Sequence, residues 1–319
     1  MISLMKNFII LFCSLFIISC SNDNNSSTEE VEGTILKSYK QDPNGNEHFF
    51  ENEGSRYEKI ISQSGDIFMK FDYDSNNKMT KIIVSPENYP TTISFTYNKD
   101  GQIIKLEKDA RNPGTAGKLS VWLFSYNANI VTGELVSENN PNFNPVKIQY
   151  TFNSDGLLIS KHDYVDSGNN NIPIKTNWYS TFKYDTNKNL VLLKTTKNGT
   201  HDLPDSPGNL YIYSTSYEYD DKTNPVHKVY MNHYINYILS NDYPFNLERG
   251  SSQDRVSGTG TNNLIKTTYP VDENGGIPVD NIYKNSYKYQ LNNLPKKMSR
   301  ISIADNKEYG SIVYNYLAK

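Results

Sequence analysis

Aromatic and polar positions follow a pattern that recurs along the chain. Each copy opens with two aromatic residues separated by one position, and Asp or Asn comes next. A short polar stretch, a Gly or Asn and an apolar run that often carries Lys complete it. The copies begin at Phe71, Phe95, Tyr150, Phe182, Tyr217 and Tyr287. Aromatic residues two positions apart lie on one face of a β-strand, so each copy predicts a strand that packs its rings against its neighbours.

The polar part of each copy predicts a turn. Asp or Asn at the end of a strand can bond its side chain to the following backbone and so begin a turn. Gly and Asn adopt positive φ more easily than other residues, which a tight hairpin requires. The Gly or Asn slots are Asn77, Gly101, Gly156, Asn189, Asn224 and Asn293. A further stretch, Phe124–Asn127, opens like a copy but has no Gly or Asn in this slot.

Successive hairpins predict an all-β fold. Antiparallel strands joined by hairpins need no crossover helices, so the copies form a meander. We expect one β-domain over residues 34–319, built of about a dozen strands. The meander is expected to form an extended twisted sheet or an incomplete barrel.

The pattern lapses over about residues 230–265. Here Tyr230, Tyr234, Tyr237 and Ile238 have the spacing of one face of a helix, which predicts one short amphipathic helix. A polar stretch with Gly258 and Gly260 follows it and predicts a long loop. We interpret the segment as an irregular helical and loop insertion that elaborates the sheet.

The repeated motif resembles the YD repeats of the RHS family, and more closely the degenerate YD-like hairpins of Bacteroidota lipoproteins. Tyr73-Asp74, Tyr184-Asp185 and Tyr219-Asp220 match the YD pair literally. The resemblance runs from about Tyr57 to the C-terminal strand, which covers most of the chain. It implies a β-hairpin architecture and a location in the cell envelope.

The N-terminus has the features of a lipoprotein signal peptide. Lys6 precedes an apolar run, Phe8–Ile18, which is shorter than a membrane-spanning helix. Ser19 and Cys20 follow it and resemble a lipobox, in which the cysteine thiol is lipidated and the chain is cut before it. We therefore expect a signal peptide over residues 1–19, lipidation at Cys20, and a flexible polar tether over residues 20–33.

Charge and cysteine content exclude several classes of function. The formal net charge is -3, so the chain lacks the basic excess that binding to nucleic acid requires. Its 2 cysteines are Cys13 and Cys20, both near the N-terminus. Cysteine nucleophiles, internal disulfides and Cys-ligated zinc are therefore not expected in the β-domain.

Candidate metal ligands fit structural roles better. Asp72, Asp74 and Asn76 are spaced like the start of an EF-hand loop, but Ile83 stands where the bidentate Glu should be. The same residue types begin turns in the other copies, so we interpret them as a turn. The five histidines, His48, His162, His201, His227 and His233, show no HExxH-type pairing, and surface or strand positions are expected for them. We expect no metal, no cofactor and no catalytic residue.

Tyrosine is the remaining candidate for a binding function, because the chain has 25 of them against 2 Trp. A candidate binding surface consists of Tyr211, Tyr213, Tyr230, Tyr234, Tyr237 and Tyr243. Exposed tyrosines stack on sugar rings and are common at protein interfaces, so a glycan or an envelope protein is the expected partner. The alternative is that tyrosine is simply the strand residue of this repeat, with the ring buried.

These features predict a non-catalytic envelope lipoprotein that presents a β-sheet surface for binding or structural contact. The lipid on Cys20 would attach it to the bacterial outer membrane, and the sequence leaves open whether it lies on the cell-surface side. Two alternatives remain: a hydrolase acting on extracellular polysaccharide, and an accessory or immunity-type lipoprotein with a single protein partner.

Overall fold

The computed structural model describes residues 34–41, 45–85, 90–110, 118–136, 146–167, 174–198, 210–240, 260–269 and 283–317. The chain divides into two units, Met1–Val31 and Glu32–Lys319, and the structure described below belongs to the second. The expected signal peptide and its cleavage site at Cys20 lie outside the described residues, as does the tether up to Gly33. They stay predictions.

The predicted all-β fold is confirmed, with 18 strands in one antiparallel sheet. In the first half the strands are β1 Leu36–Gln41, β2 Glu47–Glu51, β3 Arg56–Ile61, β4 Ile67–Tyr73, β5 Met79–Val84, β6 Thr91–Tyr97, β7 Ile103–Ala110, β8 Lys118–Asn127 and β9 Ile130–Val136. In the second half they are β10 Val146–Phe152, β11 Leu158–Ser167, β12 Ile174–Tyr184, β13 Leu190–Asn198, β14 Leu210–Thr223, β15 Asn262–Thr268, β16 Tyr283–Tyr289, β17 Pro295–Ser302 and β18 Glu308–Tyr316. A single 3-10 turn, η1, covers Asn52–Gly54.

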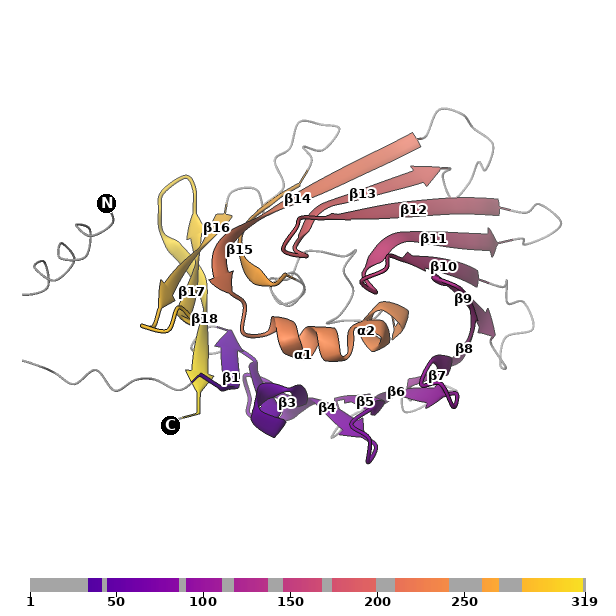
Figure 1. Cartoon of the computed structure of the whole chain (residues 1–319), viewed down its shortest axis with the longest axis horizontal. Helices are drawn as coiled ribbons and strands as arrows, with labels where there is room; N and C mark the ends of the chain where they lie inside the picture. Colours follow the sequence, from indigo (N-terminus) through magenta and orange to yellow (C-terminus); the bar gives the residue numbers. More distant parts are fainter. Residues whose placement is uncertain are drawn as a thin grey trace, which may run out of the picture. The chain divides into compact units, whose positions relative to one another are not determined.

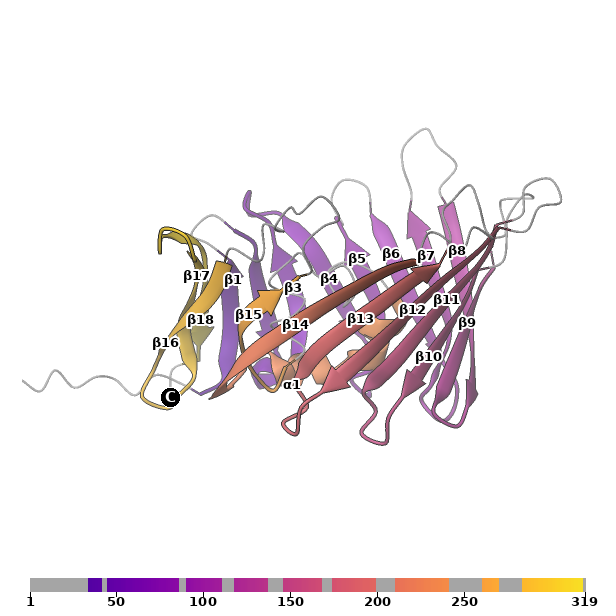
Figure 2. The same cartoon turned by 90° about the horizontal axis from the view of Figure 1, so that it is seen from above.

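The sheet curls into a barrel that is closed except at one seam (Figures 1 and 2). Each strand pairs with the next along the chain from β1 to β15, and β18 pairs back onto β1. The ladder therefore runs unbroken from β16 through β17, β18 and β1 as far as β15. Of the two arrangements that the sequence left open, the structure shows the incomplete barrel.

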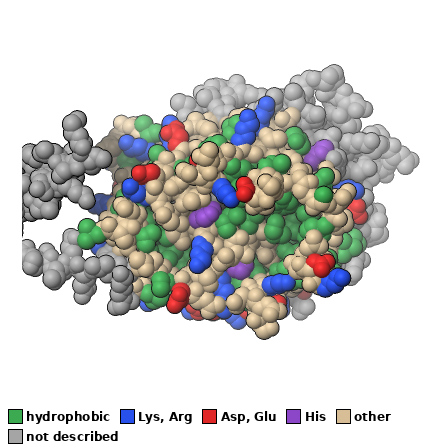
Figure 3. All heavy atoms as spheres, in the orientation of Figure 1, with side chains coloured by type: hydrophobic (Ala, Val, Ile, Leu, Met, Phe, Trp, Pro, Cys, Tyr) green, Lys and Arg blue, Asp and Glu red, His purple; other side chains and the backbone are tan. Residues whose placement is uncertain are grey.

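Most apolar side chains of the strands point into the barrel, and most charged ones lie on its outer face. On β4, for example, Met69 and Phe71 are 1% and 4% exposed, while Lys70 between them is exposed. Figure 3 shows the molecule in the same orientation as Figure 1, and on this face hydrophobic side chains are visible among Lys, Arg, acidic and histidine side chains. The period-2 alternation of the repeat is thus the division between core and solvent.

The predicted turn chemistry is confirmed in the regular hairpins. The Oδ1 atom of Asp74 accepts the backbone N–H groups of Asn76 and Lys78, each at 2.9 Å, so the Asp72–Asn76 stretch is a turn. The side chains of Asn98, Asn153 and Asp185 accept the corresponding N–H groups two and four positions on. Each of these carboxylate or amide oxygens thus accepts backbone N–H groups of its own hairpin.

The left-handed residue lies three positions after the capping residue. Asn77, Gly101, Gly156 and Asn293 have φ between 62° and 81°, as predicted. In the Asp185 hairpin, however, Lys188 has φ of 67°, so the prediction for Asn189 was wrong by one position. Asn189 instead follows the turn, where its amide is bonded and buried. Spacing from the capping residue decides the turn geometry, even where that position holds a lysine.

The second aromatic of most copies ties neighbouring strands together. Its hydroxyl donates to a backbone carbonyl near the start of the preceding strand, at 2.6 to 3.0 Å. The pairs are Tyr73 with Tyr57, Tyr97 with Met79, Tyr126 with Ile103, Tyr184 with Leu158, Tyr219 with Leu190 and Tyr316 with Pro295. Each of these rings packs against the core while its hydroxyl reaches the wall. The repeat therefore uses both parts of the tyrosine side chain.

The described helical part of the insertion lies inside the barrel, and its predicted structure needs correction. Two helices, α1 His227–Asn232 and α2 Tyr234–Ser240, replace the single expected helix, because His233 between them leaves the helical conformation. Figure 1 shows both within the ring of strands. Strand β14 runs on to Thr223 and β15 begins at Asn262, so the interruption covers 224–261. The helices α1 and α2 belong to the core rather than elaborating the sheet.

Candidate functional site at the seam of the barrel

The seam between β15 and β16 is bridged by side chains. The hydroxyl of Tyr287 donates to the backbone carbonyl of Leu264 at 2.9 Å, and the amide Nδ2 of Asn285 donates to the same carbonyl at 3.0 Å. The Tyr287 bond repeats the tyrosine tie found elsewhere in the barrel. Elsewhere the tie accompanies a backbone ladder, whereas no β15–β16 register is found among the described strands.

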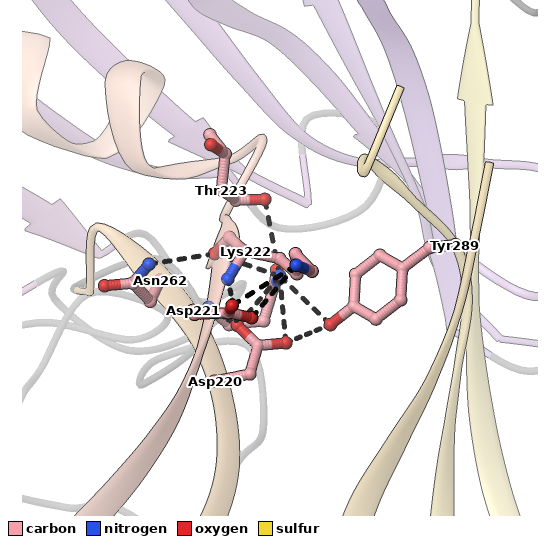
Figure 4. Close-up of polar contacts among 7 residues, drawn as sticks. Asp220, Asp221, Lys222, Thr223, Asn262 and Tyr289 are labelled. Carbon is pink, nitrogen blue, oxygen red and sulfur yellow. Dashed lines mark hydrogen bonds and ion pairs between the residues drawn. The ribbon is translucent and has the colours of Figure 1, made fainter. Parts of the chain in front are cut away.

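A second set of hydrogen bonds, centred on the Asp220 carboxylate, also bridges the seam (Figure 4). Asp220 lies on β14, Asn263 on β15 and Tyr289 on β16. The Asp220 carboxylate accepts hydrogen bonds from the Tyr289 hydroxyl and from the backbone N–H of Asn263, the latter at 3.1 Å. Three strands that are far apart in the sequence therefore meet at one carboxylate.

This site arises because the Asp220 copy of the repeat is interrupted. Its Oδ1 atom accepts the N–H of Lys222, two positions on, as in a regular hairpin. The N–H four positions on is that of Asn224, which instead bonds the carbonyl of Thr261. The N–H of Asn263 on β15 takes the vacated place at Asp220. A cap that is local in the other copies thus becomes a bond between strands.

Amide side chains surround this carboxylate. The Asn263 side chain is 2% exposed, and its Nδ2 lies 3.4 Å from both Asp220 oxygens and 3.4 Å from the Tyr289 hydroxyl. Nearby, the Asn262 backbone N–H donates to the Asn189 amide oxygen at 2.9 Å. Because these amides are buried, each depends on a protein partner for its hydrogen bonds.

Burial and the adjoining Asp220 carboxylate raise the pKa of Tyr289 well above its ordinary value. The phenol therefore remains protonated and serves as a hydrogen-bond donor at neutral pH. Asp220 in turn accepts bonds from Lys222, Asn263 and Tyr289, which occupy both of its oxygens. These bonds make Asp220 a structural tie between strands β14, β15 and β16.

The helices inside the barrel are bonded to opposite walls. Tyr234 on α2 accepts the backbone N–H of Leu158 on β11 at 2.9 Å. Asn236, also on α2, donates its Nδ2 to the hydroxyl of Tyr97 on β6 at 2.7 Å. Asn232 at the end of α1 donates to the backbone carbonyl of Ser55, which precedes β3. The helices therefore cross-link strands that are distant around the barrel.

Two histidines lie in this interior. His233, between the helices, is 5% exposed, and burial, aided by Arg56, lowers its pKa to about 4. Burial lowers the pKa of His48 on β2 to about 3, and its ring stacks on Tyr39 at 4.4 Å. The expectation of a surface or strand position holds for His48 but was wrong for His233. The tertiary fold draws the insertion, and this histidine with it, into the core.

The candidate tyrosine surface is divided by the fold. Tyr230, Tyr234 and Tyr237 are 3%, 5% and 0% exposed and pack on the helices inside the barrel, so they cannot form an outer binding surface. Tyr211 and Tyr213 belong to β14, but their side chains lie outside the described residues, as does Tyr243. For the three helix residues, the buried-ring alternative is the correct one.

The seam residues were missed by sequence reasoning. Asn263 and Asn285 lie outside the motif, and nothing in their local sequence indicates a partner. Tyr289 and Asp220 are both motif residues, and the signal that could have linked them is that both copies depart from the pattern. Gln290 replaces the acidic residue after Tyr289, and the insertion replaces the turn after Asp220.

Within the described residues, no cluster of three or more His, Cys, Asp or Glu side chains could hold a metal ion. Among the same residues, no helix is long and apolar enough to cross a membrane.

Comparison with solved structures finds a porin-like protein from Bacteroides vulgatus with a TM-score of 0.34 and 9% identity, covering 89% of this chain and 99% of that one. A porin-like protein from Bacteroides uniformis gives a TM-score of 0.28 and 10% identity, covering 74% and 94%. A complex of TcdB2, TccC3 and Cdc42 gives 0.23 and 10%, covering 84% of this chain and 16% of that one. No family model and no curated protein sequence matches the chain. Because all three TM-scores are low, the fold assignment rests on the strand ladders above.

Proposed function

We propose that the protein is a non-catalytic lipoprotein of the bacterial cell envelope, attached to the outer membrane through Cys20, whose barrel lies in water and serves binding or structural contact. The observation that carries this proposal is the distribution of charge on the barrel wall. The buried core is largely apolar, and among the described Lys, Arg, Asp and Glu side chains only Lys161 is buried. A barrel wall that faces lipid has the reverse arrangement, with an apolar outer band.

Ion pairs cover several faces of the barrel. On the outer face Lys147 of β10 lies 3.3 Å from Glu134 of β9, and Lys266 of β15 lies 3.2 Å from Glu218 of β14. Lys105 and Glu107 on β7 lie 2.9 Å apart. Placing such groups in hydrocarbon costs several kcal/mol each near the bilayer centre, so an aqueous position is strongly favoured. Membrane attachment then falls to the lipid predicted at Cys20.

The barrel interior supports a structural rather than catalytic role. The helices α1 and α2 fill part of it with buried rings, and their polar groups bond the wall. The carboxylates of Asp74, Asp185 and Asp220 accept backbone N–H groups and fix turns or the seam. A polysaccharide hydrolase would need a pair of carboxylates turned toward substrate, and these three are turned toward their own backbone.

The proposal is tested by following the lipid and the protein together. Cells fed a clickable fatty acid should label the wild-type protein, and Cys20→Ala should abolish the label and release the protein from the membrane fraction. Cys13→Ala is the matched control, because Cys13 leaves with the predicted signal peptide, and it should change neither result. Labelling that persists in Cys20→Ala would contradict the lipid anchor. Extraction of the wild-type barrel only by detergent, even after its lipidated N-terminus is cut off, would contradict the aqueous barrel.

A further inference from the structure

We propose that the seam between β15 and β16 is a docking site for an extended, acidic peptide strand of a partner protein. The inference deepens the proposed function and rests on it, because it names the kind of partner that the barrel would bind. It begins from the one place where the backbone ladder of the described strands is interrupted. Strand β15 pairs with β14 and strand β16 with β17, and side chains bridge the space between them.

A strand edge without a ladder partner is a template for another strand. The backbone N–H and C=O groups along such an edge can pair with an extended peptide, which then joins the sheet. At the seam two such edges face each other, so an inserted strand could pair on both sides. Insertion would exchange the side-chain bonds to the Leu264 carbonyl for two backbone ladders, which makes the exchange favourable for a peptide that is already extended.

The charge around the seam selects for acidic residues. On the outer face of β16, Lys284 and Lys288 are exposed. Lys266 on β15 is paired with Glu218. On the far side of β16, Lys297 is paired with Glu308. The outer face of the seam therefore carries a positive excess on β16, next to the place that an added strand would take. Opposite charges on adjacent strands are favourable, so carboxylates are expected on the outer face of the peptide.

The inner face of the seam selects for hydroxyl side chains. Asn263, Asn285 and Tyr287 lie along this side and offer amide and phenol groups. These groups need hydrogen-bond partners when they are buried, and an apolar side chain beside them would leave them unpaired. Side chains of a strand alternate between faces, so the peptide that fits has Glu outward and Thr or Ser inward.

One hydrogen bond across the seam, from the Tyr289 hydroxyl to Asp220, can be removed by substitution, and we call it the latch. Its removal leaves the strand ladders on either side untouched. A matched tyrosine lies at another boundary: the Tyr316 hydroxyl donates to the carbonyl of Pro295, where β17 and β18 have a complete ladder. Tyr289→Phe and Tyr316→Phe therefore remove the same chemical group from an interrupted and from an intact boundary.

The test measures fluorescence anisotropy of labelled peptides with the purified full-length protein. The probe is a nonapeptide of alternating Thr and Glu, compared with one of alternating Thr and Lys and with one in which Pro replaces each Thr. We expect the Thr–Glu peptide to bind about tenfold more tightly than the Thr–Lys peptide, with the preference reversed in Lys284→Glu/Lys288→Glu. The Pro peptide has the same charge but lacks the N–H groups along one of its two edges, so it cannot pair with both β15 and β16 and should bind far more weakly.

The latch variants complete the test. Tyr289→Phe should strengthen binding of the Thr–Glu peptide several-fold, and Tyr316→Phe should leave it unchanged. No binding of the Thr–Glu peptide, equal binding of the Pro peptide, or equal effects of the two Phe variants would each overturn the strand-docking proposal. None of these outcomes bears on lipid labelling at Cys20, so failure here is distinguishable from failure of the proposed envelope function.

Discussion

The hairpin at Asp185 and the site at Asp220 begin with the same motif and end in different structures. Asp185 accepts the N–H groups of Asn187 and Asn189, both within its own turn. Asp220 accepts one N–H from its own strand, one N–H from β15 and the Tyr289 hydroxyl from β16. The first carboxylate is exposed at a hairpin tip, and the second holds the seam of the barrel together.

The difference shows that the motif provides a carboxylate that can accept hydrogen bonds. Which N–H groups it accepts depends on the path of the chain after the motif. Where the chain turns back within four residues, the carboxylate caps the turn. Where the chain leaves to form α1 and α2, the same carboxylate is available to a distant strand. The carboxylate of the interrupted copy is therefore bonded directly to β15 and β16, whereas the Asp185 carboxylate accepts hydrogen bonds only from residues of its own turn. The following variants test that contrast.

The largest effect is expected from the helices that interrupt the Asp220 copy. Tyr237 on α2 is 0% exposed, so Tyr237→Ala should lower the free energy of unfolding by about 3–5 kcal/mol through lost burial and a cavity. Urea unfolding followed by circular dichroism measures it. Tyr179→Ala, at a strand tyrosine that is 44% exposed, is the control and should cost about 1 kcal/mol or less. Similar losses for both would show that the helices are not part of the core.

Acid should destabilise the protein through the same insertion. The pKa of His233 is lowered from 6.5 to about 4 in the folded state. The unfolded state thus binds more protons between these values, and stability falls as the pH drops from 6.5 to 4, by up to ~3 kcal/mol. His48, whose pKa is lowered to about 3, adds to the loss in the same direction.

Unfolding free energies of wild type and His233→Gln, measured at intervals from pH 7.5 to pH 4, test this prediction. The variant should be less stable than wild type at pH 7.5 and should have the shallower pH dependence. Parallel curves for the two proteins would contradict a role for His233.

The two capping aspartates should differ in cost. Asp220→Ala removes the acceptor of buried Asn263 and of Tyr289, and should lower the free energy of unfolding by about 2–3 kcal/mol. Asp185→Ala removes a turn cap at an exposed tip and should cost about 1 kcal/mol. Thermal or urea unfolding of the two variants side by side makes the comparison. Equal costs would mean that Asp220 acts only as a turn cap.

The smallest effect is expected inside a regular hairpin. Lys188 has φ of 67°, which strains a residue with a Cβ, so Lys188→Gly should raise stability by about 0.5 kcal/mol. The reverse change, Gly156→Ala at φ of 76°, meets no atom within 4 Å and should cost about 1 kcal/mol through backbone strain alone. The midpoint of urea unfolding resolves both. A loss of stability in Lys188→Gly would show that the lysine side chain, which bonds Asp155 at 3.0 Å, outweighs the strain.

The sequence predicted the hairpins well because their causes are local. The aromatic pair, the capping Asp or Asn and the left-handed position all lie within a few residues, so Asp74 and Asn77 could be assigned from the pattern. The strand count was too low, since β1, β2 and β9 lack the full motif. The β8–β9 turn lacks Gly and Asn in the expected slot, yet forms with Ala128 at φ of 52°.

The sequence by itself thus determined an antiparallel β-meander, its turn chemistry and its alternation of core and solvent, because each depends on neighbours along the chain. Only the tertiary structure decided that the sheet curls into a nearly closed barrel, that α1 and α2 lie inside it, and that Asp220, Asn263 and Tyr289 meet at the seam. Closure depends on the accumulated twist of 18 strands, which no local pattern encodes. The fate of Asp220 depends on residues 43 and 69 positions away, so its role could appear only once the barrel had formed.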